Sequence, residues 1–360
     1  MTAIDAPTVS ASRSWLRGSS LVIRRRSWSV RLRPRSIVVG VLLVAATLAI
    51  SVWSIMVGDF PLSVGQVLRS LFGDGGDDAE FIVQTLRLPR AITAMLVGAA
   101  LGMSGAVFQS IARNPLGSPD IIGFESGAAA GAVIVIVVFH GSSTQVALGA
   151  VAGGLLTALL VYTLAYKRGL AASRLVLVGI GIGFAASALV DYLITRAQIY
   201  DVQRAAVWLT GSLNGRTWDH VRTITVALVV LAPTILIAQR SLDRLELGDD
   251  TAAALGVRVG RTKLLLILLA VGLAALAVAA AGPIVFVAFV SAPIARRLTS
   301  TSGACVVPAA LVGAFVTSAA DLAARRVFAP TEFPVGIATA VIGAPYLLWL
   351  LGRRARTGAL

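Results

Sequence analysis

The sequence predicts an all-α membrane protein that crosses the bilayer about ten times. Of its 360 residues, 57% are hydrophobic and only 13% are charged, and the mean hydropathy is +0.87. A soluble domain of this length would expose far more charge. Apolar runs of about 20 residues recur, which suits helices that cross a bilayer, whereas membrane β-barrels have shorter strands of alternating polarity.

The candidate helices are apolar runs that end at charged residues or at Gly and Pro. The eighth run is short and follows the seventh through the sequence AAAGPI, so these two are expected to form a tight, re-entrant-like hairpin. In chain order, the ten runs are Ile37–Val57, Arg90–Ile111, Ile121–Phe139, Gln145–Tyr166, Leu175–Thr195, Val221–Ala238, Leu264–Ala280, Ile284–Ile294, Val306–Ala324 and Val335–Leu351.

The distribution of charge orients these helices. Basic residues next to membrane spans mark the cytoplasmic side. Arginines precede the first run and follow the last, so both termini are predicted to be cytoplasmic, at the cell membrane. The first external segment is acidic and is expected to be flexible. We therefore divide the chain into a basic cytoplasmic N-terminal tail (1–35), a transmembrane permease domain (36–352, with a cytoplasmic loop at about 240–263) and a short basic C-terminal tail (353–360).

Several function classes are disfavoured by composition. The net charge is +14, but the arginines flank membrane spans, so contact with membrane lipid is predicted and nucleic-acid binding is not. Cys305 is the only cysteine and the two histidines lie far apart in sequence, so no metal site is expected. A multi-span membrane enzyme or scaffold is the alternative from another class. An enzyme would need spaced nucleophiles or paired carboxylates, which the spans do not show.

Three features inside the spans carry further expectations. Glycines, among them Gly102, Gly105 and Gly181, are predicted to allow close helix packing. Two roles fit Gln109 equally: lining a transport path, or a hydrogen bond to a neighbouring helix. Arg325 lies at an outer helix end, against the charge rule, one turn after Asp321. Either a buried ion pair or a functional basic patch on the outer face explains it.

A short polar segment, SLDRLELGDDTAAALGVRVGRTK (Ser241–Lys263), separates two spans on the cytoplasmic side. It predicts a helix of one to two turns, in which Asp249 and Asp250 cap the start and Gly256 ends the helix. Such a short helix would not persist alone in water, so it needs support from the rest of the chain.

Several motifs together resemble the FecCD/BtuC family, the permeases of ABC importers for ferric siderophores, haem and cobalamin. They occur in the family's order over most of the chain outside residues 1–35. The motifs are RLPRAITAMLVGAALGMSGAVFQSIARNPLGSPDIIGFESG (Arg87–Gly127), WLTGSLNGRTW (Trp208–Trp218), LGDDTAAALGV (Leu247–Val257), AGPIVFVAFVSAPIARRL (Ala281–Leu298), DLAAR (Asp321–Arg325) and TEFPVGIATAVIGAPYLLWLL (Thr331–Leu351).

This resemblance implies a type II ABC importer permease that moves a ferric siderophore, of the ferric-enterobactin type, inward through a path lined by few charges. Cobalamin or haem is the alternative cargo. The implied partners are a cytosolic ABC ATPase dimer, a second permease subunit (a paralogue or a second copy) and an extracytoplasmic siderophore-binding protein. The chain has no GxxxxGK[ST] loop, so it is expected to be no enzyme and to bind no cofactor itself, with ATP and Mg²⁺ on the ATPase.

The resemblance also implies site residues. Arg87, Arg90 and Arg325 correspond to arginines that pair with glutamates of the binding protein. Pro293 stands where many members have a histidine, which favours a siderophore-type subunit that works beside a different permease. The short polar helix corresponds to the element that couples to the ATPase, with the residues Leu247, Gly248, Asp249, Asp250, Thr251, Ala252, Ala253, Ala254, Leu255 and Gly256.

Overall fold

The computed structural model describes residues 8–12, 20–25, 28–73, 76–120, 122–167, 172–327, 329 and 331–356. Within these residues, seven helices are long and apolar enough to cross a membrane, and two shorter apolar helices cover Phe124–Val137 and Val335–Trp349. The predicted all-α membrane architecture is therefore confirmed.

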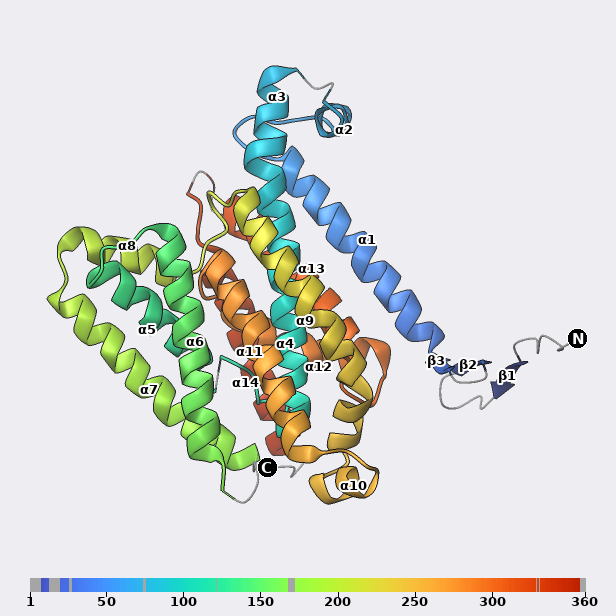
Figure 1. Ribbon diagram of the computed structural model, residues 1–360. Coiled ribbons are helices and arrows are strands. Elements are labelled where there is room, and N and C mark those ends of the chain that lie inside the picture. The colour runs from blue at the N-terminus through green and yellow to red at the C-terminus, as the bar shows by residue number, and fades with distance from the viewer. Residues whose placement is uncertain are drawn as a thin grey trace, which may run out of the picture.

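Each of the ten predicted runs coincides with one helix (Figure 1). The eighth is short, as expected, and follows the seventh after a bend at Gly282. The ten helices are α1 (Pro34–Met56), α4 (Leu88–Ala112), α5 (Phe124–Val137), α6 (Ser143–Ala165), α7 (Ala172–Arg196), α9 (Trp218–Leu245), α11 (Val259–Ala281), α12 (Val287–Thr299), α13 (Val306–Arg326) and α14 (Val335–Arg356).

Short helices occupy the connections. α2 (Val64–Leu71), α3 (Asp77–Phe81) and the π-helix η1 (Ile82–Arg87) form the first external segment, and η1 runs directly into α4. The flexibility expected of this segment stays a prediction. Within it, Ser63 and Gln66 form a capping box that starts α2. α8 (Ile199–Leu209) follows α7, and α10 (Asp249–Ala254) follows α9.

The N-terminal tail contains strands, which the sequence analysis does not predict. β1 (Thr8–Ser12), β2 (Ser20–Arg25) and β3 (Trp28–Leu32) form an antiparallel sheet in the order β1-β2-β3. The sheet lies beside the start of α1, away from the bundle (Figure 1). Residues 1–7, 13–19 and 26–27 of this tail and residues 357–360 of the C-terminal tail lie outside the described residues.

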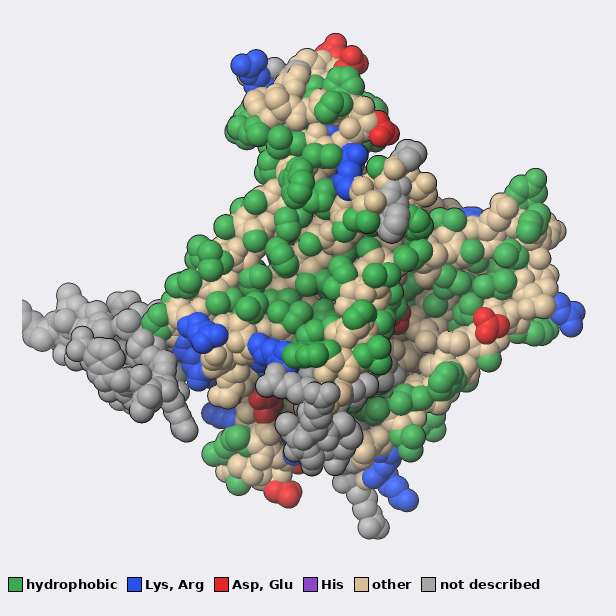
Figure 2. Space-filling model, turned by 180° about the vertical axis from the view of Figure 1, so that it is seen from behind, with side chains coloured by type: hydrophobic (Ala, Val, Ile, Leu, Met, Phe, Trp, Pro, Cys, Tyr) green, Lys and Arg blue, Asp and Glu red, His purple; other side chains and the backbone are tan. Residues whose placement is uncertain are grey.

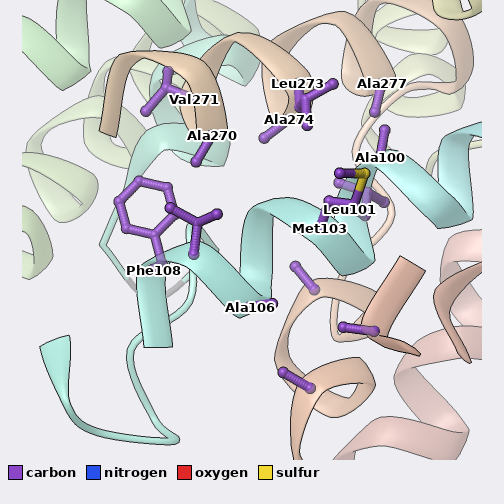
Figure 3. Packing of buried hydrophobic residues seen from close by; sticks show 14 of the residues in the cluster. Ala100, Leu101, Met103, Ala106, Phe108, Ala270, Val271, Leu273, Ala274 and Ala277 are labelled. Carbon is purple, nitrogen blue, oxygen red and sulfur yellow. The ribbon is translucent and has the colours of Figure 1, made fainter. Parts of the chain in front are cut away.

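α4 is the central helix of the bundle. In its most apolar stretch, 78% of the residues are buried, against 11% for α1 and 17% for α7. Leu101, Met103 and Phe108 of α4 belong to the same buried cluster as Val271 and Leu273 of α11, and Figure 3 shows the two helices packed side by side. The apolar surface of α1 and α7 is left for lipid or for partner subunits.

Glycines bring the neighbours of α4 close. A Cβ atom on Gly102 would collide with the carbonyl oxygen of Ala309, and one on Gly105 with that of Ala288. The predicted packing role is confirmed at these two positions, since only glycine permits such backbone approach. It is wrong for Gly181, where an added Cβ would meet no described atom within 4 Å.

The two ends of the bundle differ in character. The start of α1, the last turns of α14 and α10 lie at one end, and α2 and α3 lie at the other (Figure 1). The first of these ends is cytoplasmic, because the basic loops and tails gather there. Hydrophobic side chains cover much of the surface between the ends, and acidic side chains mark the outer tip (Figure 2).

Candidate functional site

Arg87, Arg90 and Arg325 come together at the outer end of the bundle. They line one hollow of about 540 Å³, where the end of η1, the start of α4 and the end of α13 meet. Arg216 and Arg326 line the same hollow and were not singled out for this role from the sequence. The hollow is therefore basic, with five arginines against two acidic residues, Asp59 and Glu332. Four segments far apart in sequence form it, around Phe60, Arg87, Arg216 and Arg325.

Asp321 holds two of these arginines. Its carboxylate pairs with Arg90 on α4 at 2.9 Å and with Arg325, one turn further along α13, at 3.5 Å. The side chains of Asp321 and Arg325 are 3% and 7% exposed. Arg325 also donates to the carbonyl and hydroxyl oxygens of Ser54 on α1. The buried ion pair expected as one of two explanations for Arg325 is present, and it joins α1, α4 and α13.

The other three arginines of the hollow differ in the hydrogen bonds that their side chains make. Arg87 donates to the carbonyl oxygens of Ile55 (2.7 Å) and Phe60 (2.8 Å), and so fixes the turn after α1. Arg216 donates to the Ser212 carbonyl at 3.0 Å, and burial lowers the pKa of its guanidinium. Arg326 Nε has no hydrogen-bond partner among the described residues. The same holds for Arg325 Nε, and both atoms are buried.

α10 forms at the predicted place, but its start differs from the prediction. The N-cap residue is Gly248, at φ 109°, so the expected capping by Asp249 and Asp250 is wrong. Asp249 is instead the first helical residue, and its carboxylate pairs with Lys263 at 2.7 Å. Gly256, at φ 83°, follows the helix, and its N–H donates to the carbonyl of Ala253. The predicted end is thus confirmed.

One face of α10 is anchored and the other is free. Ala252 is fully buried, whereas Ala253 and Ala254 are exposed. Leu247 and Leu255, which flank the helix, are 63% and 50% exposed. The cytoplasmic end therefore presents a small apolar surface with short side chains, a shape that fits into a cleft on another protein.

A third feature is a cavity of about 500 Å³ among α5, α7, α12 and α14. Asp120, Glu125 and Asp191 line it, together with apolar side chains such as Phe286 and Phe289. Asp120 accepts a hydrogen bond from the Phe286 N–H at 3.1 Å, which joins the loops that precede α5 and α12. Both helices have fewer than the about 20 residues that a crossing needs. Irregular backbone next to such short helices is tolerated in membranes where it is buried or lines a cavity.

Gln109 does not belong to the lining of that cavity. It is buried, and its amide Nε2 donates to the carbonyl of Phe289 on α12 at 2.9 Å. Of the two roles considered for Gln109, the structure shows the hydrogen bond between helices.

Comparison with known proteins supports the resemblance seen in the motifs. The model of the FecCD transport family matches residues 42–353. The ferric enterobactin transport system permease protein FepG of Escherichia coli (strain K12) is 41% identical over 89% of this chain and 98% of its own length. The Fe(3+)-citrate import system permease protein YfmE of Bacillus subtilis (strain 168) is 39% identical over 91% of this chain and 98% of its own length.

A solved structure agrees with these relatives. It is an inward-facing ABC transporter of the metal-chelate type that covers 87% of this chain and 98% of its own, at 30% identity and a TM-score of 0.78. Its fold is thus the fold described above. The family model spans nearly the whole described bundle, and two relatives matched over almost their full length are near 40% identical to this chain. This multi-pass protein of the cytoplasmic membrane therefore belongs to the FecCD transport family.

Proposed function

We propose that this chain is the translocation subunit of an ABC importer that carries ferric-siderophore complexes into the cell. ATP and Mg²⁺ bind a separate cytosolic ATPase dimer. A second permease subunit, a paralogue or another copy, completes the path, and an extracytoplasmic protein delivers the cargo. Alternating access moves the cargo, as helix bundles rock about the path between the two subunits.

The observation that carries this proposal is the placement of a basic hollow and an exposed short helix at opposite ends of one bundle. The basic hollow lies outside and suits an acidic partner, and the exposed face of α10 lies inside and suits a cleft. A permease that links an external delivery protein to an internal motor needs this arrangement. The siderophore class follows the relatives, whose names specify ferric enterobactin, Fe(3+)-citrate and iron(3+)-hydroxamate.

Reconstitution tests this function directly. The chain is placed in liposomes with its candidate second permease and ATPase. Uptake is followed with radioactive iron for a panel of ferric siderophores and haem, and with radioactive cobalt for cobalamin. We expect the binding protein to stimulate ATP hydrolysis and one ferric siderophore to enter. ATP hydrolysis that responds neither to this subunit nor to the binding protein would contradict the proposal. Selective uptake of haem or cobalamin would show that the cargo is not a ferric siderophore.

The outer hollow gives a prediction for Arg326. Replacement by glutamate places a carboxylate where an acidic partner docks, so binding of the delivery protein is expected to weaken by about 10-fold to 100-fold, most strongly at low salt. Surface plasmon resonance on the reconstituted complex measures this affinity. Arg222→Glu is the matched control, because Arg222 is exposed on α9 and does not line the hollow. Equal weakening by both variants would contradict docking in the hollow.

The cavity among α5, α7, α12 and α14 gives a prediction for cargo charge. We place it on the transport path, because three carboxylates in a membrane protein mark a functional cavity rather than a packed core. An iron(III) tris-catecholate carries three negative charges and a tris-hydroxamate carries none, so the exposed carboxylate of Asp191 disfavours the first. Asp191→Asn is expected to raise the uptake ratio of catecholate to hydroxamate several-fold. Ser187→Ala, in the same lining, is expected to leave the ratio unchanged. An unchanged ratio in Asp191→Asn would remove Asp191 from the path.

A further inference from the structure

The short helix α10 is tied to the membrane helices by an ion pair between a buried lysine and a partly exposed aspartate. Lys263 lies in the first turns of α11, its side chain is 3% exposed, and its ammonium contacts the Asp249 carboxylate at 2.7 Å. Arg113, directly after α4, reaches the other oxygen of the same carboxylate at 3.9 Å. The first residue of α10 is thus linked to the cytoplasmic ends of both α11 and α4.

A second ion pair lies just before α10. Glu246, the residue that ends α9, pairs with Arg296 of α12 at 3.0 Å. The same guanidinium donates to the Ser110 hydroxyl on α4 at 3.1 Å and to the Gly303 carbonyl at 3.2 Å. Arg296 therefore joins the segment that leads into α10 to α4, to α12 and to the loop before α13.

Charge-assisted contacts of this kind are short and directional, so they transmit displacement better than apolar contacts that can slide. Separating Lys263 from Asp249 would leave the buried ammonium without its counter-charge, so this contact resists breaking when the helices move. α12 contains both Arg296 and, two turns earlier, Phe289, which lines the cavity of Asp120 and Glu125. The contacts thus form a continuous connection from the exposed face of α10 to that cavity.

We propose that Lys263 and Arg296 are positioning residues that transmit the movement of α10 to α11 and α12, and so couple ATP hydrolysis to opening of the path. This inference rests on the proposed function. It assigns a role to two basic side chains, the buried Lys263 and the partly buried Arg296, which lie outside the exposed face of α10.

The experiment measures iron uptake per ATP hydrolysed in the complete reconstituted importer. Lys263→Met is expected to retain ATP hydrolysis and to lower this ratio by about tenfold, the usual size of a coupling between two sites. The exchanged pair Asp249→Lys with Lys263→Asp is expected to recover part of the loss, since it restores the contact with opposite polarity while Arg113 then faces a lysine. Retained ATP hydrolysis in Lys263→Met distinguishes a loss of coupling from a general loss of folding.

Lys167→Met is the matched control, because Lys167 is an exposed lysine in another cytoplasmic loop; its ratio is expected to stay unchanged. The inference is overturned if Lys263→Met lowers uptake and ATP hydrolysis in the same proportion, or if the exchanged pair folds and recovers nothing. A Lys263→Met protein that does not accumulate leaves the exchanged pair to decide. If the unaltered importer takes up no ferric siderophore at all, the proposed function fails instead, which is a separate outcome.

Discussion

Ala253→Arg is expected to abolish uptake while the protein still inserts into the membrane. Ala253 is exposed on α10, and the face it belongs to carries only short side chains between Leu247 and Leu255. In the proposed docking of α10 on the ATPase, an arginine there would enter the cleft with its charge unpaired. Such a buried, unpaired charge costs about 2–5 kcal/mol, or more than about 30-fold in affinity.

The measurements are siderophore uptake, co-purification of the ATPase and the amount of protein in the membrane fraction. Gly352→Arg provides the control, because Gly352 is also exposed near the cytoplasmic end and an added Cβ would meet no described atom within 4 Å. Uptake at the normal rate by Ala253→Arg would remove α10 from the coupling role.

Asp321→Asn is expected to cause the largest loss of stability among single substitutions at the outer end. The carboxylate is shared by Arg90 and Arg325. The asparagine would leave the buried Arg325 guanidinium without a counter-charge and Arg90 with only Glu332, at 3.3 Å. Breaking a buried pair in this way costs about 3–5 kcal/mol. The apparent Tm in detergent is therefore expected to fall by several degrees.

Asp219→Asn is the matched comparison, since Asp219 pairs with Arg222 at 3.5 Å in an exposed position. Exposed pairs contribute little because water and salt screen them, so its Tm is expected to stay the same. If both variants melted at the temperature of the parent protein, the Asp321 contacts would contribute nothing measurable to stability.

The sequence was sufficient to predict the helices, because each apolar run is long and ends at charge or at a helix breaker. It was not sufficient at short polar segments. The start of α10 shows why: Asp249 fits both the N-cap and the first helical position, and only the geometry of Gly248, at φ 109°, decides between them. α2 was missed although its capping box, Ser63 with Gln66, is visible in the sequence.

The candidate site residues, too, could be predicted only where a local sequence pattern indicates them. The family motifs indicated Arg87, Arg90 and Arg325 as site residues, and the structure places all three in one hollow. Asp321 was paired correctly with Arg325, since the two lie one helical turn apart, but its second contact with Arg90 depends on how α4 meets α13. The grouping of Asp120, Glu125 and Asp191 was missed for that reason too. No local pattern reports that distant helices approach each other, and the expected lining with few charges did not include these residues.

The burial of α4 has a consequence for how the chain is made. α4 is the second of the ten long or apolar helices to leave the ribosome, yet the carbonyls that fit against Gly102 and Gly105 belong to Ala309 of α13 and Ala288 of α12. Until those late segments are synthesised, the glycine face of α4 has only lipid or temporary neighbours. The glycine face of α4 can therefore close only near the end of translation, and a nascent chain truncated before α12 would hold its most central helix without its partners α12 and α13.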